Sequence, residues 1–292
     1  MRVPASTANL GPGFDTVGMA LGLYDVVEAA LDDTAGDGLQ VEVIDTGAGD
    51  ADSVPRDESH LVVRALRQAA EQLGFELPGL RLTCANAIPH ARGLGSSAAA
   101  VVAGAAAAYG LAGVPLDRAA VLQLAAGFDG HADNAAASLL GGVVLTWRDD
   151  ASWQATRLEP HPGIRPVLAV AEQRSSTEAT RGLLPQTVPH ADAAHAAARA
   201  ALGMHALTAD PSLLLPGTED RLHQPYRAAA YPATAELVER LRAGGVAATV
   251  SGAGPSVLAL TGDGRLPDDV DTTGFRLLEL RADLGGVTVS AT

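Results

Sequence analysis

The spacing of apolar residues switches repeatedly between the period of a strand and the period of a helix. Alternation of apolar and polar residues predicts a strand, and apolar positions three and four apart predict a helix. In the first half this pattern predicts strands at 39–44, 80–84, 142–147 and 153–158 and helices at 59–73, 96–109 and 117–126. In the second half it predicts strands at 167–171, 247–250, 256–260 and 275–280 and helices at 190–209 and 233–243. Interleaved elements of both kinds indicate an α+β or α/β sandwich and exclude an all-helical or all-strand fold.

A change in composition near the middle of the chain predicts a domain boundary. Residues 148–166 are polar and rich in proline around one short strand, and a chain of 292 residues is long for a single minimal core. We therefore expect two domains, at residues 1–155 and 156–292.

The composition limits both the core and the partners. Hydrophobic residues make up 47% of the chain but aromatic residues only 3%, so the core must consist mainly of Ala, Val and Leu in tightly packed helices. The formal net charge of -14 repels polyanions, so nucleic acid and anionic membranes are not expected partners. The longest apolar stretch, 98–113, is too short for a membrane span and predicts a buried helix.

The single cysteine and the N-terminus bear on the compartment. Cys84 cannot form an intramolecular disulfide, and no charged segment leads into an apolar signal core after Met1. A reducing, cytoplasmic location is therefore expected. A homodimer is left open, because nothing in the sequence specifies an assembly.

The most informative segment lies between the strand at 80–84 and the helix that follows it. It reads Pro89-His90-Ala91-Arg92-Gly93-Leu94-Gly95-Ser96-Ser97-Ala98-Ala99. The two glycines allow positive φ and a close approach of the backbone to a bulky anion, and the serines fall at a helix N-terminus, where free N–H groups favour phosphate. A glycine turn with capping serines is the simpler interpretation of Gly-x-Gly-Ser alone. The segment is neither a Walker loop nor a dinucleotide fingerprint, because Gly-Lys-Ser/Thr and Gly-x-Gly-x-x-Gly are absent.

The full string resembles the phosphate loop of GHMP kinases, Pro-x-x-x-Gly-Leu-Gly-Ser-Ser-Ala-Ala. The N-terminal segment through Asp15 resembles the first motif of that superfamily, and Val250-Ser251-Gly252-Ala253-Gly254-Pro255-Ser256 resembles the third. The resemblance implies a two-domain α+β fold, with a left-handed βαβ crossover in the N-terminal domain and a ferredoxin-like C-terminal domain. It also implies that the eleven-residue loop binds the phosphates of ATP in a cleft between the domains.

Four further segments are similar to the homoserine kinase family within this superfamily. They are 8–15, 130–134, 176–185 and 220–227. This resemblance implies that ATP phosphorylates the hydroxyl of L-homoserine, a step of threonine biosynthesis. Homoserine also presents a carboxylate and an ammonium, which need complementary groups, and a guanidinium fork suits a carboxylate.

The resemblance implies a role for each matched residue. Arg181 and Arg227 match carboxylate-binding arginines, Asn9 and Asp15 match residues at the amino end, and Asn134 matches the residue beside the reacting hydroxyl. Three more matched residues complete the implied set: Asp133, next to Asn134 in the catalytic pair, and Thr177 and Gly254 in the substrate site.

Each of these residues also has a simpler interpretation. The two arginines could lie on the surface, and Asp15 could stabilise a turn by bonding to its own backbone. His131 is more readily explained as a structural turn residue than as a base. No role is predicted for the remaining histidines on helical patterns, His60, His195 and His205.

The metal site is the least defined part of the sequence. The resemblance implies Mg²⁺, with Ser97 as an oxygen ligand. Gln123 stands where some relatives place a magnesium-binding glutamate, and Gly127 stands where many carry an acid. Either Asp129 therefore supplies the carboxylate, or ATP and Ser97 hold the metal.

Two other functions remain open from the sequence. One is another GHMP kinase, of the mevalonate or diphosphocytidyl-methylerythritol type, although those substrates lack the α-amino group that would explain Asn9 and Asp15. The other is a catalytically silent relative that binds ATP or an amino acid as a sensor. The neutral Gln123 favours this second alternative, whereas the intact phosphate loop and Asn134 favour an enzyme.

Overall fold

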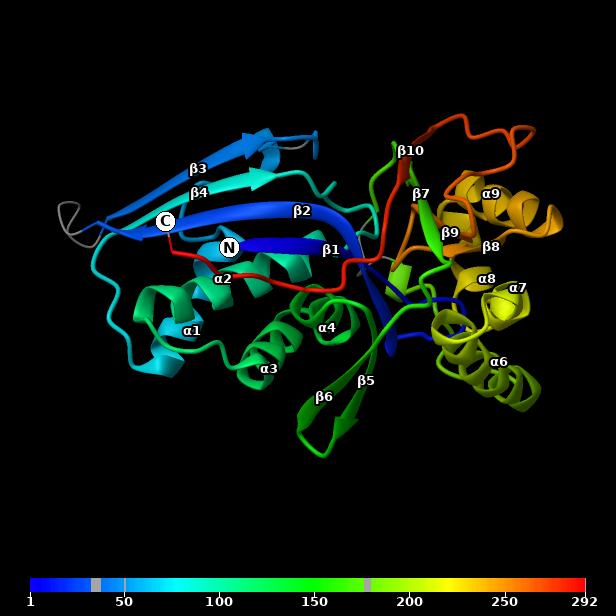
Figure 1. Ribbon diagram of the computed structural model, residues 1–292, viewed down its shortest axis with the longest axis horizontal. Coiled ribbons are helices and arrows are strands. Elements are labelled where there is room, and N and C mark those ends of the chain that lie inside the picture. The colour runs from blue at the N-terminus through cyan, green and yellow to red at the C-terminus, as the bar shows by residue number, and fades with distance from the viewer. Residues whose placement is uncertain (33–37, 50, 176–179, 292) are drawn as a thin grey trace.

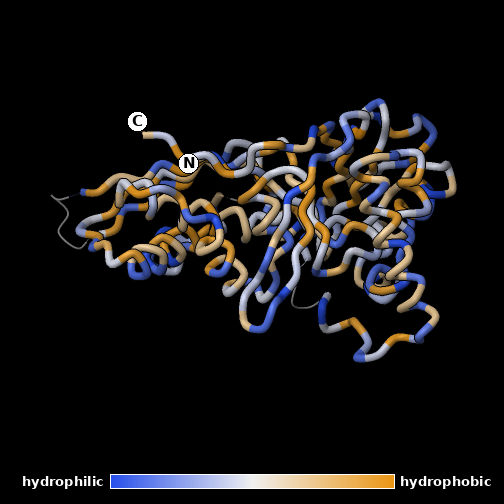
Figure 2. Tube along the Cα trace, turned by 60° about the horizontal axis from the view of Figure 1, so that its bottom comes forward, coloured by the Kyte–Doolittle hydropathy of each residue, from blue (hydrophilic) through white to orange (hydrophobic). Residues whose placement is uncertain are grey.

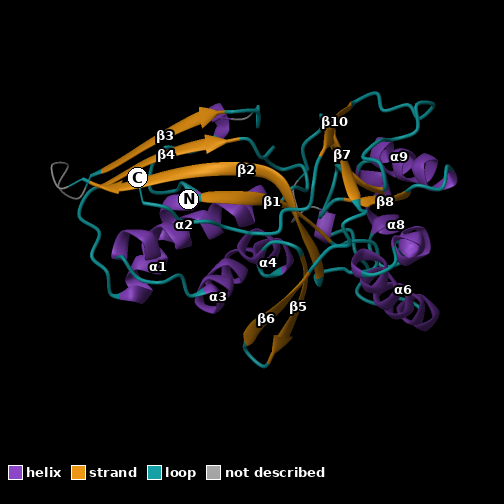
Figure 3. Ribbon diagram, in the orientation of Figure 1, coloured by secondary structure: helices purple, strands orange, loops and turns teal. Residues whose placement is uncertain are grey.

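Two β-sheets, each packed against its own helices, lie side by side (Figure 1). A computed structural model describes residues 1–32, 38–49, 51–175 and 180–291. Helices and strands alternate along most of this chain (Figure 3). The α+β prediction is therefore confirmed.

The first sheet has six strands in the order β3-β4-β2-β5-β6, with β1 also paired to β2. All pairs are antiparallel except β3 with β4. Its strands are β1 (Arg2–Ala8), β2 (Val17–Leu31), β3 (Leu39–Asp45), β4 (Leu80–Asn86), β5 (Val143–Asp149) and β6 (Ser152–Leu158).

The longest strand, β2, is absent from the sequence prediction. It has 15 residues and pairs with β1, β4 and β5. Its sequence carries Gly18 and Gly22 and no regular alternation, because its first residues are buried on both sides. Continuous apolar character does not distinguish a strand from a buried helix, so only the pairing partners reveal it.

Four helices cover one face of this sheet (Figure 1). They are α1 (Leu61–Leu73), α2 (Ser96–Ala112), α3 (Arg118–Asp129) and α4 (Asp133–Leu140). The predicted boundaries hold well, since Gly74 ends α1 in the left-handed conformation and Asp117 caps α3 by accepting from the Ala120 N–H.

Helix α2 is the centre of the predicted small-residue core. Most of its residues are buried Ala, Val and Gly. A Cβ at Gly104 would overlap the Val62 carbonyl oxygen of α1, so the glycine allows the two helices to approach closely. Because β3, α1 and β4 form a βαβ unit with parallel strands, this half has the crossover element that the resemblance implies.

The second sheet has four antiparallel strands in the order β10-β7-β9-β8. They are β7 (Arg165–Ala171), β8 (Ala247–Val250), β9 (Val257–Thr261) and β10 (Phe275–Glu279). In chain order this arrangement is 4-1-3-2, the ferredoxin-like topology. The second crossover, residues 262–274, is a loop without a helix.

Both faces of the second sheet are buried. Leu168 and Leu258 belong to the main core, whereas Val167 and Val257, which point to the opposite face, pack with helix α9 (Pro232–Ala243). The other helices of this half are α6 (His190–Thr208), α7 (Leu214–Gly217) and α8 (Gln224–Arg227). Figure 2 shows the projecting tip of the β5–β6 hairpin as hydrophilic.

The chain passes from the first half to the second after β6 and returns to the first half near the C-terminus. The predicted boundary after residue 155 falls within β6, so we place the division in the loop 159–164 as a proposal. The C-terminal segment returns to the first sheet, where Thr288 bridges Arg2 and Ala282 bridges Leu21. No helix in the described part of the chain is long and apolar enough to cross a membrane.

Candidate active site

The glycine loop connects the end of β4 to the first turn of α2, as predicted. Gly93 and Gly95 both have positive φ, 77° and 66°. No side chain caps α2 at Gly95, so the N–H groups of the first turn are available to an anion. The positive end of the helix dipole adds to the attraction for phosphate.

Neighbouring segments hold the loop so closely that only glycine fits. A Cβ at Gly93 would overlap the Ser251 carbonyl oxygen, and one at Gly95 would overlap the Ser6 hydroxyl. The Ser251 Oγ donates to the Gly93 carbonyl at 2.6 Å, and the Ser6 N–H donates to the Leu94 carbonyl at 3.1 Å. The first and third predicted motifs therefore support the loop directly.

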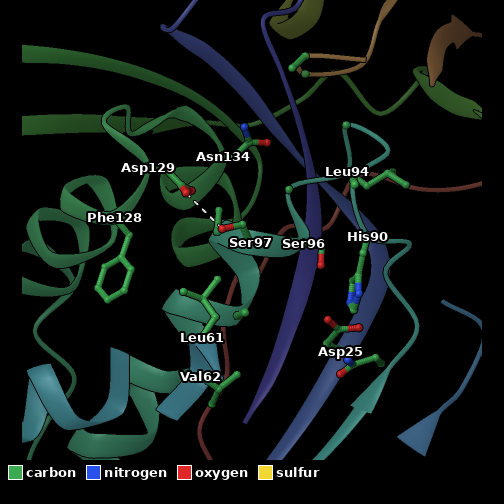
Figure 4. Close-up of a pocket in the computed structure, with 18 of the residues that line it drawn as sticks. Asp25, Leu61, Val62, His90, Leu94, Ser96, Ser97, Phe128, Asp129 and Asn134 are labelled. Atoms are coloured by element: carbon green, nitrogen blue, oxygen red, sulfur yellow. Dashed lines mark hydrogen bonds between the residues drawn. The ribbon is translucent and has the colours of Figure 1, made fainter. Parts of the chain in front are cut away.

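The loop opens onto a cleft of about 830 Å³ that both halves of the molecule line. Figure 4 shows Ser96 and Ser97 at the start of α2, with Asp129 and Asn134 on one side and His90 and Asp25 on the other. Loop residues other than Pro89, Arg92 and Ala99 line the cleft, together with these predicted residues: Asn9, Asp129, Asn134, Arg181 and Arg227.

Four predicted residues have other positions. Gly254 lies behind the cleft-lining Gly252 and Ala253, where its Cα faces the Tyr231 ring. Asp15 and Asp133 form hydrogen bonds with the lining residues Arg181 and Asn134, as described below, and Thr177 lies outside the described residues.

Asn134 faces the cleft from the first turn of α4, and its neighbours fix its side chain. The Ser6 Oγ donates to Asn134 Oδ1 at 3.0 Å. Asp133, which is 1% exposed, accepts from the Asn134 N–H at 2.8 Å and lies 2.9 Å from His131 Nδ1. Asp133 is therefore placed to orient Asn134 and His131 rather than to touch a ligand.

His131 combines the predicted turn role with a position in the cleft lining. Burial favours its neutral form, but the hydrogen bond and charge of Asp133, with smaller contributions from Asp15 and Asp129, outweigh burial and raise the pKa of His131. The neighbouring carboxylates therefore stabilise the protonated form of His131 relative to an isolated buried histidine.

Ser97 and Asp129 form the pair that fits a divalent metal ion. The Ser97 Oγ donates to Asp129 Oδ1 at 3.2 Å (Figure 4). Burial raises the pKa of Asp129, and the nearby His131 and the Ser97 hydrogen bond offset this only in part. No cluster of three or more His, Cys, Asp or Glu side chains suits a metal ion in the described ranges. One carboxylate with a hydroxyl nevertheless fits Mg²⁺ that is also held by nucleotide phosphates.

Gln123 has no place in this metal site. Its Nε2 donates to the Trp153 carbonyl and its Oε1 accepts from the Trp153 N–H, both at 2.7 Å. Both ends of the amide are therefore used to attach α3 to β6. Gly127 carries no acid, and nothing lies within 4 Å of a Cβ built there. Asp129 is the acid of this segment that reaches the loop, because its carboxylate accepts from Ser97.

The other end of the cleft contains the residues predicted for an amino acid. Asp15 and Arg181 form a bidentate ion pair, with both N–O distances 2.8 Å. Asn9 accepts from the Asp15 N–H at 2.8 Å and donates to the Gly252 carbonyl at 3.0 Å. The Asp15 carboxylate thus bonds to Arg181 and not to its own turn.

Arg227 is a buried cation, which excludes the surface interpretation. Its side chain is 1% exposed, and burial lowers its pKa. Its Nε donates to the Thr180 carbonyl at 3.4 Å, and its Nη1 lies 3.3 Å from His223 Nδ1. Among described residues no carboxylate forms a salt bridge with it. A buried charge without a partner is costly, so the site favours an anionic ligand.

Two cleft residues have no counterpart in the sequence prediction, His60 and Asp25. His60 is the N-cap of α1 and is 3% exposed. Its Nδ1 accepts from the Val62 N–H, so the proton is on Nε2, which has no hydrogen-bond partner among the described residues. His60 therefore offers one N–H to a ligand. The only available signal was a histidine at the start of the helix predicted at 59–73.

Asp25 of β2 secures the chain just before the glycine loop. Its Oδ1 accepts from the Ala87 and Ile88 N–H groups at 2.7 and 2.9 Å. Burial, only partly opposed by these hydrogen bonds, raises its pKa to about 6. Because β2 was not predicted, this residue could not be placed.

The chain matches two family models and several curated relatives. The model "GHMP kinases N terminal domain" matches residues 60–142, and "GHMP kinases C terminal" matches residues 194–270. The homoserine kinase of Rhodococcus erythropolis is 51% identical over 307 aligned positions, which cover 100% of this chain and 95% of that protein. The homoserine kinase of Streptomyces coelicolor is 50% identical over 295 positions, covering 99% and 93%.

A solved structure supports the fold independently. The crystal structure of homoserine kinase from Cytophaga hutchinsonii aligns with a TM-score of 0.84 at 24% identity, covering 98% of this chain and 95% of that one. At this identity the likeness concerns the fold.

Proposed function

The chain belongs to the GHMP kinase family, and we propose that it transfers the terminal phosphoryl group of ATP to the side-chain hydroxyl of L-homoserine. The product is O-phospho-L-homoserine, an intermediate of threonine biosynthesis. The enzyme is thus a phosphotransferase with an alcohol acceptor, the activity named for relatives that are about half identical over nearly the whole chain.

The glycine loop binds the phosphates of ATP in this proposal. The free N–H groups at the start of α2 face the cleft, and Gly93 and Gly95 let the backbone approach the ligand. Phosphoryl transfer requires positioning and charge neutralisation more than covalent help from the protein.

Ser97 and Asp129 hold Mg²⁺ in this proposal. Their oxygens are 3.2 Å apart in the cleft, and hard oxygen ligands match this ion. When bound, the metal neutralises charge on the phosphates.

The two arginines and Asp15 recognise the amino-acid part of homoserine. Arg227 is already buried and lacks a carboxylate partner among described residues, so the substrate carboxylate would supply one. Asp15 accepts the ammonium group, with Arg181 shared between Asp15 and the carboxylate. Thr177 and Gly254 remain predicted contributors from the resemblance alone.

Asn134 orients the hydroxyl of homoserine for in-line attack. Its Oδ1 accepts from Ser6 at 3.0 Å and its Nδ2 donates to Asp133 Oδ1 at 3.5 Å, which leaves one amide N–H to contact the substrate oxygen. An amide does not take up a proton at neutral pH, so the hydroxyl proton passes to the phosphate. Asp133 holds the Asn134 backbone from behind.

The observation that carries this proposal is the meeting of three predicted features in one cleft. The phosphate loop, Asn134 and the two arginines come from distant parts of the sequence and line the same space. Such convergence of a phosphate site with an unpartnered buried arginine favours a kinase whose acceptor is an anionic small molecule.

A direct assay tests this assignment. Purified protein is incubated with ATP, Mg²⁺ and either L-homoserine or mevalonate, and ADP release is followed. We expect ADP with homoserine and none above background with mevalonate. A preference for mevalonate would replace the substrate assignment, and stabilisation by homoserine without any ADP would indicate a binding protein instead of an enzyme.

A further inference from the structure

His223 lies completely buried between the two segments that build the amino-acid end of the cleft. It is 0% exposed and immediately precedes α8, which carries Arg227. Asp220 accepts from the N–H groups of Leu222, His223 and Gln224 at 2.7, 3.1 and 2.7 Å. The backbone that carries His223 is therefore fixed on its own side.

The partners of the two ring nitrogens fix the tautomer of His223. Its Nε2 lies 2.7 Å from the Gly11 carbonyl oxygen, which can only accept, so Nε2 carries the proton. Its Nδ1 lies 3.3 Å from Arg227 Nη1, which can only donate, so Nδ1 is unprotonated. The imidazole is neutral and joins the two groups.

The charged groups around the ring agree with this state. Asp220 Oδ2 lies 3.5 Å from Nε2 and Arg227 lies on the other side. Burial lowers the pKa of His223, and this outweighs the opposing effect of Asp220. A second proton on Nδ1 would point an N–H at the guanidinium group.

Both groups that His223 joins belong to the proposed substrate site. Gly11 lies in the loop between Asn9 and Asp15, and its N–H donates to Thr249 Oγ1 at 3.1 Å. This loop presents Asp15, whereas Arg227 belongs to the other half of the molecule. The distance between the ammonium-binding and carboxylate-binding groups therefore depends on the contact between the halves.

We propose that His223 is a positioning residue that sets the spacing between the Asp15 loop and the Arg227 guanidinium, and so selects an α-amino acid. This inference rests on the proposed function. His223 is not in the cleft lining, so it acts through Gly11 and Arg227 rather than on the substrate.

Phe14 provides a second support at the same place. The guanidinium carbons of Arg181 and Arg227 lie 5.3 and 5.4 Å from the centre of its ring, and the His223 ring lies at 5.4 Å. A face of an aromatic ring attracts guanidinium groups. Phe14 thus orients two like charges that would otherwise repel each other.

Three substitutions separate the contacts of His223. His223→Gln can keep a donor near Nε2 for the Gly11 carbonyl, His223→Asn can keep an acceptor near Nδ1 for Arg227, and His223→Ala removes both. We expect the homoserine KM to rise about tenfold or more in His223→Ala, because the lost hydrogen bond to the charged Arg227 has an effect of this order. The Gln and Asn variants should recover part of that loss, while the ATP KM stays within about twofold of wild type.

A matched control and a second readout keep the test decisive. His205→Ala removes an exposed histidine of α6 in the same half and should leave both KM values unchanged. Calorimetric binding of L-homoserine gives the same comparison without turnover, so it applies even if the wild-type protein proves inactive. Nitrogen-15 NMR of labelled histidine should show Nε2 protonated and Nδ1 unprotonated.

Distinct outcomes would overturn the inference. One is a folded His223→Ala variant with wild-type affinity for homoserine. Another is an equal loss of affinity for ATP and homoserine together with a lower melting temperature, which would indicate a purely structural residue. A proton on Nδ1 in the NMR spectrum would refute the assigned tautomer. Failure of wild-type turnover, in contrast, would count against the kinase assignment alone.

Discussion

The two ends of the cleft are built in different ways. The end that we propose for phosphate, called the phosphate end below, consists of consecutive residues, a glycine loop followed directly by the first turn of α2. The amino-acid end is assembled from separate segments, joined by the hydrogen bonds Arg181–Asp15, His223–Gly11, Gly11–Thr249 and Asn9–Gly252, which span 166, 212, 238 and 243 residues.

The two ends also differ in charge before any ligand binds. The phosphate end offers backbone N–H groups and a helix dipole, which carry no net charge. The amino-acid end holds Arg181 in an ion pair with Asp15 and Arg227 without one among the described residues. In the proposed function, binding of homoserine at this end replaces the Arg181–Asp15 ion pair, at least in part, by ion pairs with the carboxylate and ammonium groups of the substrate. Substitutions that change the backbone conformation should therefore impair ATP binding at the phosphate end. Substitutions that change side-chain charge should impair homoserine binding at the amino-acid end.

The largest expected effect is that of Gly93→Ala at the phosphate end. The new Cβ would overlap the Ser251 carbonyl oxygen, and the residue has a φ of 77°. Moving the loop by even about 1 Å can cost on the order of 100-fold in rate. We expect kcat/KM for ATP to fall by about this factor, measured by ADP release.

Gly113→Ala is the matched control for that substitution. Gly113 caps the other end of α2 with a φ of 67° and has nothing within 4 Å of a built Cβ. It should cost roughly 1–2 kcal/mol of stability from backbone strain and no activity. If both variants lost activity equally, strain in α2 rather than the loop position would be responsible.

At the amino-acid end, Arg227→Ala should raise the homoserine KM about 10- to 100-fold. A charge-assisted hydrogen bond to a carboxylate contributes roughly 1.5–3 kcal/mol. The sequence alone predicts the same rise for Arg181→Ala. The structure reduces that expectation, because the Arg181 side chain is 41% exposed and already shared with Asp15, and exposed pairs contribute less.

Steady-state kinetics for both substrates tests this ranking. The ATP KM should stay near the wild-type value in both variants, since neither arginine contacts the phosphate loop. Equal effects of the two substitutions, or a larger effect of Arg181→Ala, would show that exposure does not decide their contributions.

A smaller effect is expected from Asp129→Asn, which removes the carboxylate next to Ser97. The Mg²⁺ concentration for half-maximal activity should rise about tenfold. Because the pKa of Asp129 is raised, the wild-type enzyme should also need more Mg²⁺ as the pH falls and the carboxyl gains a proton. The variant should lack this dependence.

Asp117→Asn serves as the comparison, because it removes a carboxylate from the opposite end of α3. Its Mg²⁺ requirement should match that of the wild type. A tenfold change there as well would mean that net charge, and not a ligand, controls the metal affinity.

The smallest effect on activity is expected for Asp25→Asn, which tests whether the loop is held by hydrogen bonds or by charge. An amide oxygen can accept from Ala87 and Ile88 as the carboxylate does. The pKa of Asp25 is raised from 3.8 to about 6, so the folded state retains a proton that the unfolded state releases. Its contribution to stability is complete below about pH 3.8 and is lost as the pH rises through about 6.

Asp25→Asn should therefore be more stable than wild type at pH 7.5, by up to about 3 kcal/mol, and should show a smaller difference near pH 5. Urea unfolding at both pH values measures this difference. The same difference at both pH values would contradict the raised pKa.

The sequence predicted the position of the glycine loop and the start of the following helix. Gly93, Gly95 and the helix start at Ser96 are local features, and local φ preferences and helix-start signals depend on neighbouring residues. The periodicity also located most helices and strands to within a few residues. It failed for β2, whose first residues are buried on both sides, which removes the alternation that marks a strand.

The amino-acid end could be predicted only through the resemblance to a family. Nothing in the spacing of Asp15, Arg181 and Arg227 shows that they meet. The same limit applies to Gln123, which the resemblance associates with the metal site and the fold attaches to the Trp153 backbone.

The sequence by itself therefore determined the elements, the glycine loop and the chemical types of the site residues. The tertiary structure alone decided which of them share a cleft, that Arg227 is buried, and that His223 connects the two halves. The physical reason is how far along the sequence each kind of interaction reaches. Backbone preferences and periodicity act over a few residues, whereas burial and the pairing of charges depend on segments that become neighbours only when the two sheets pack together.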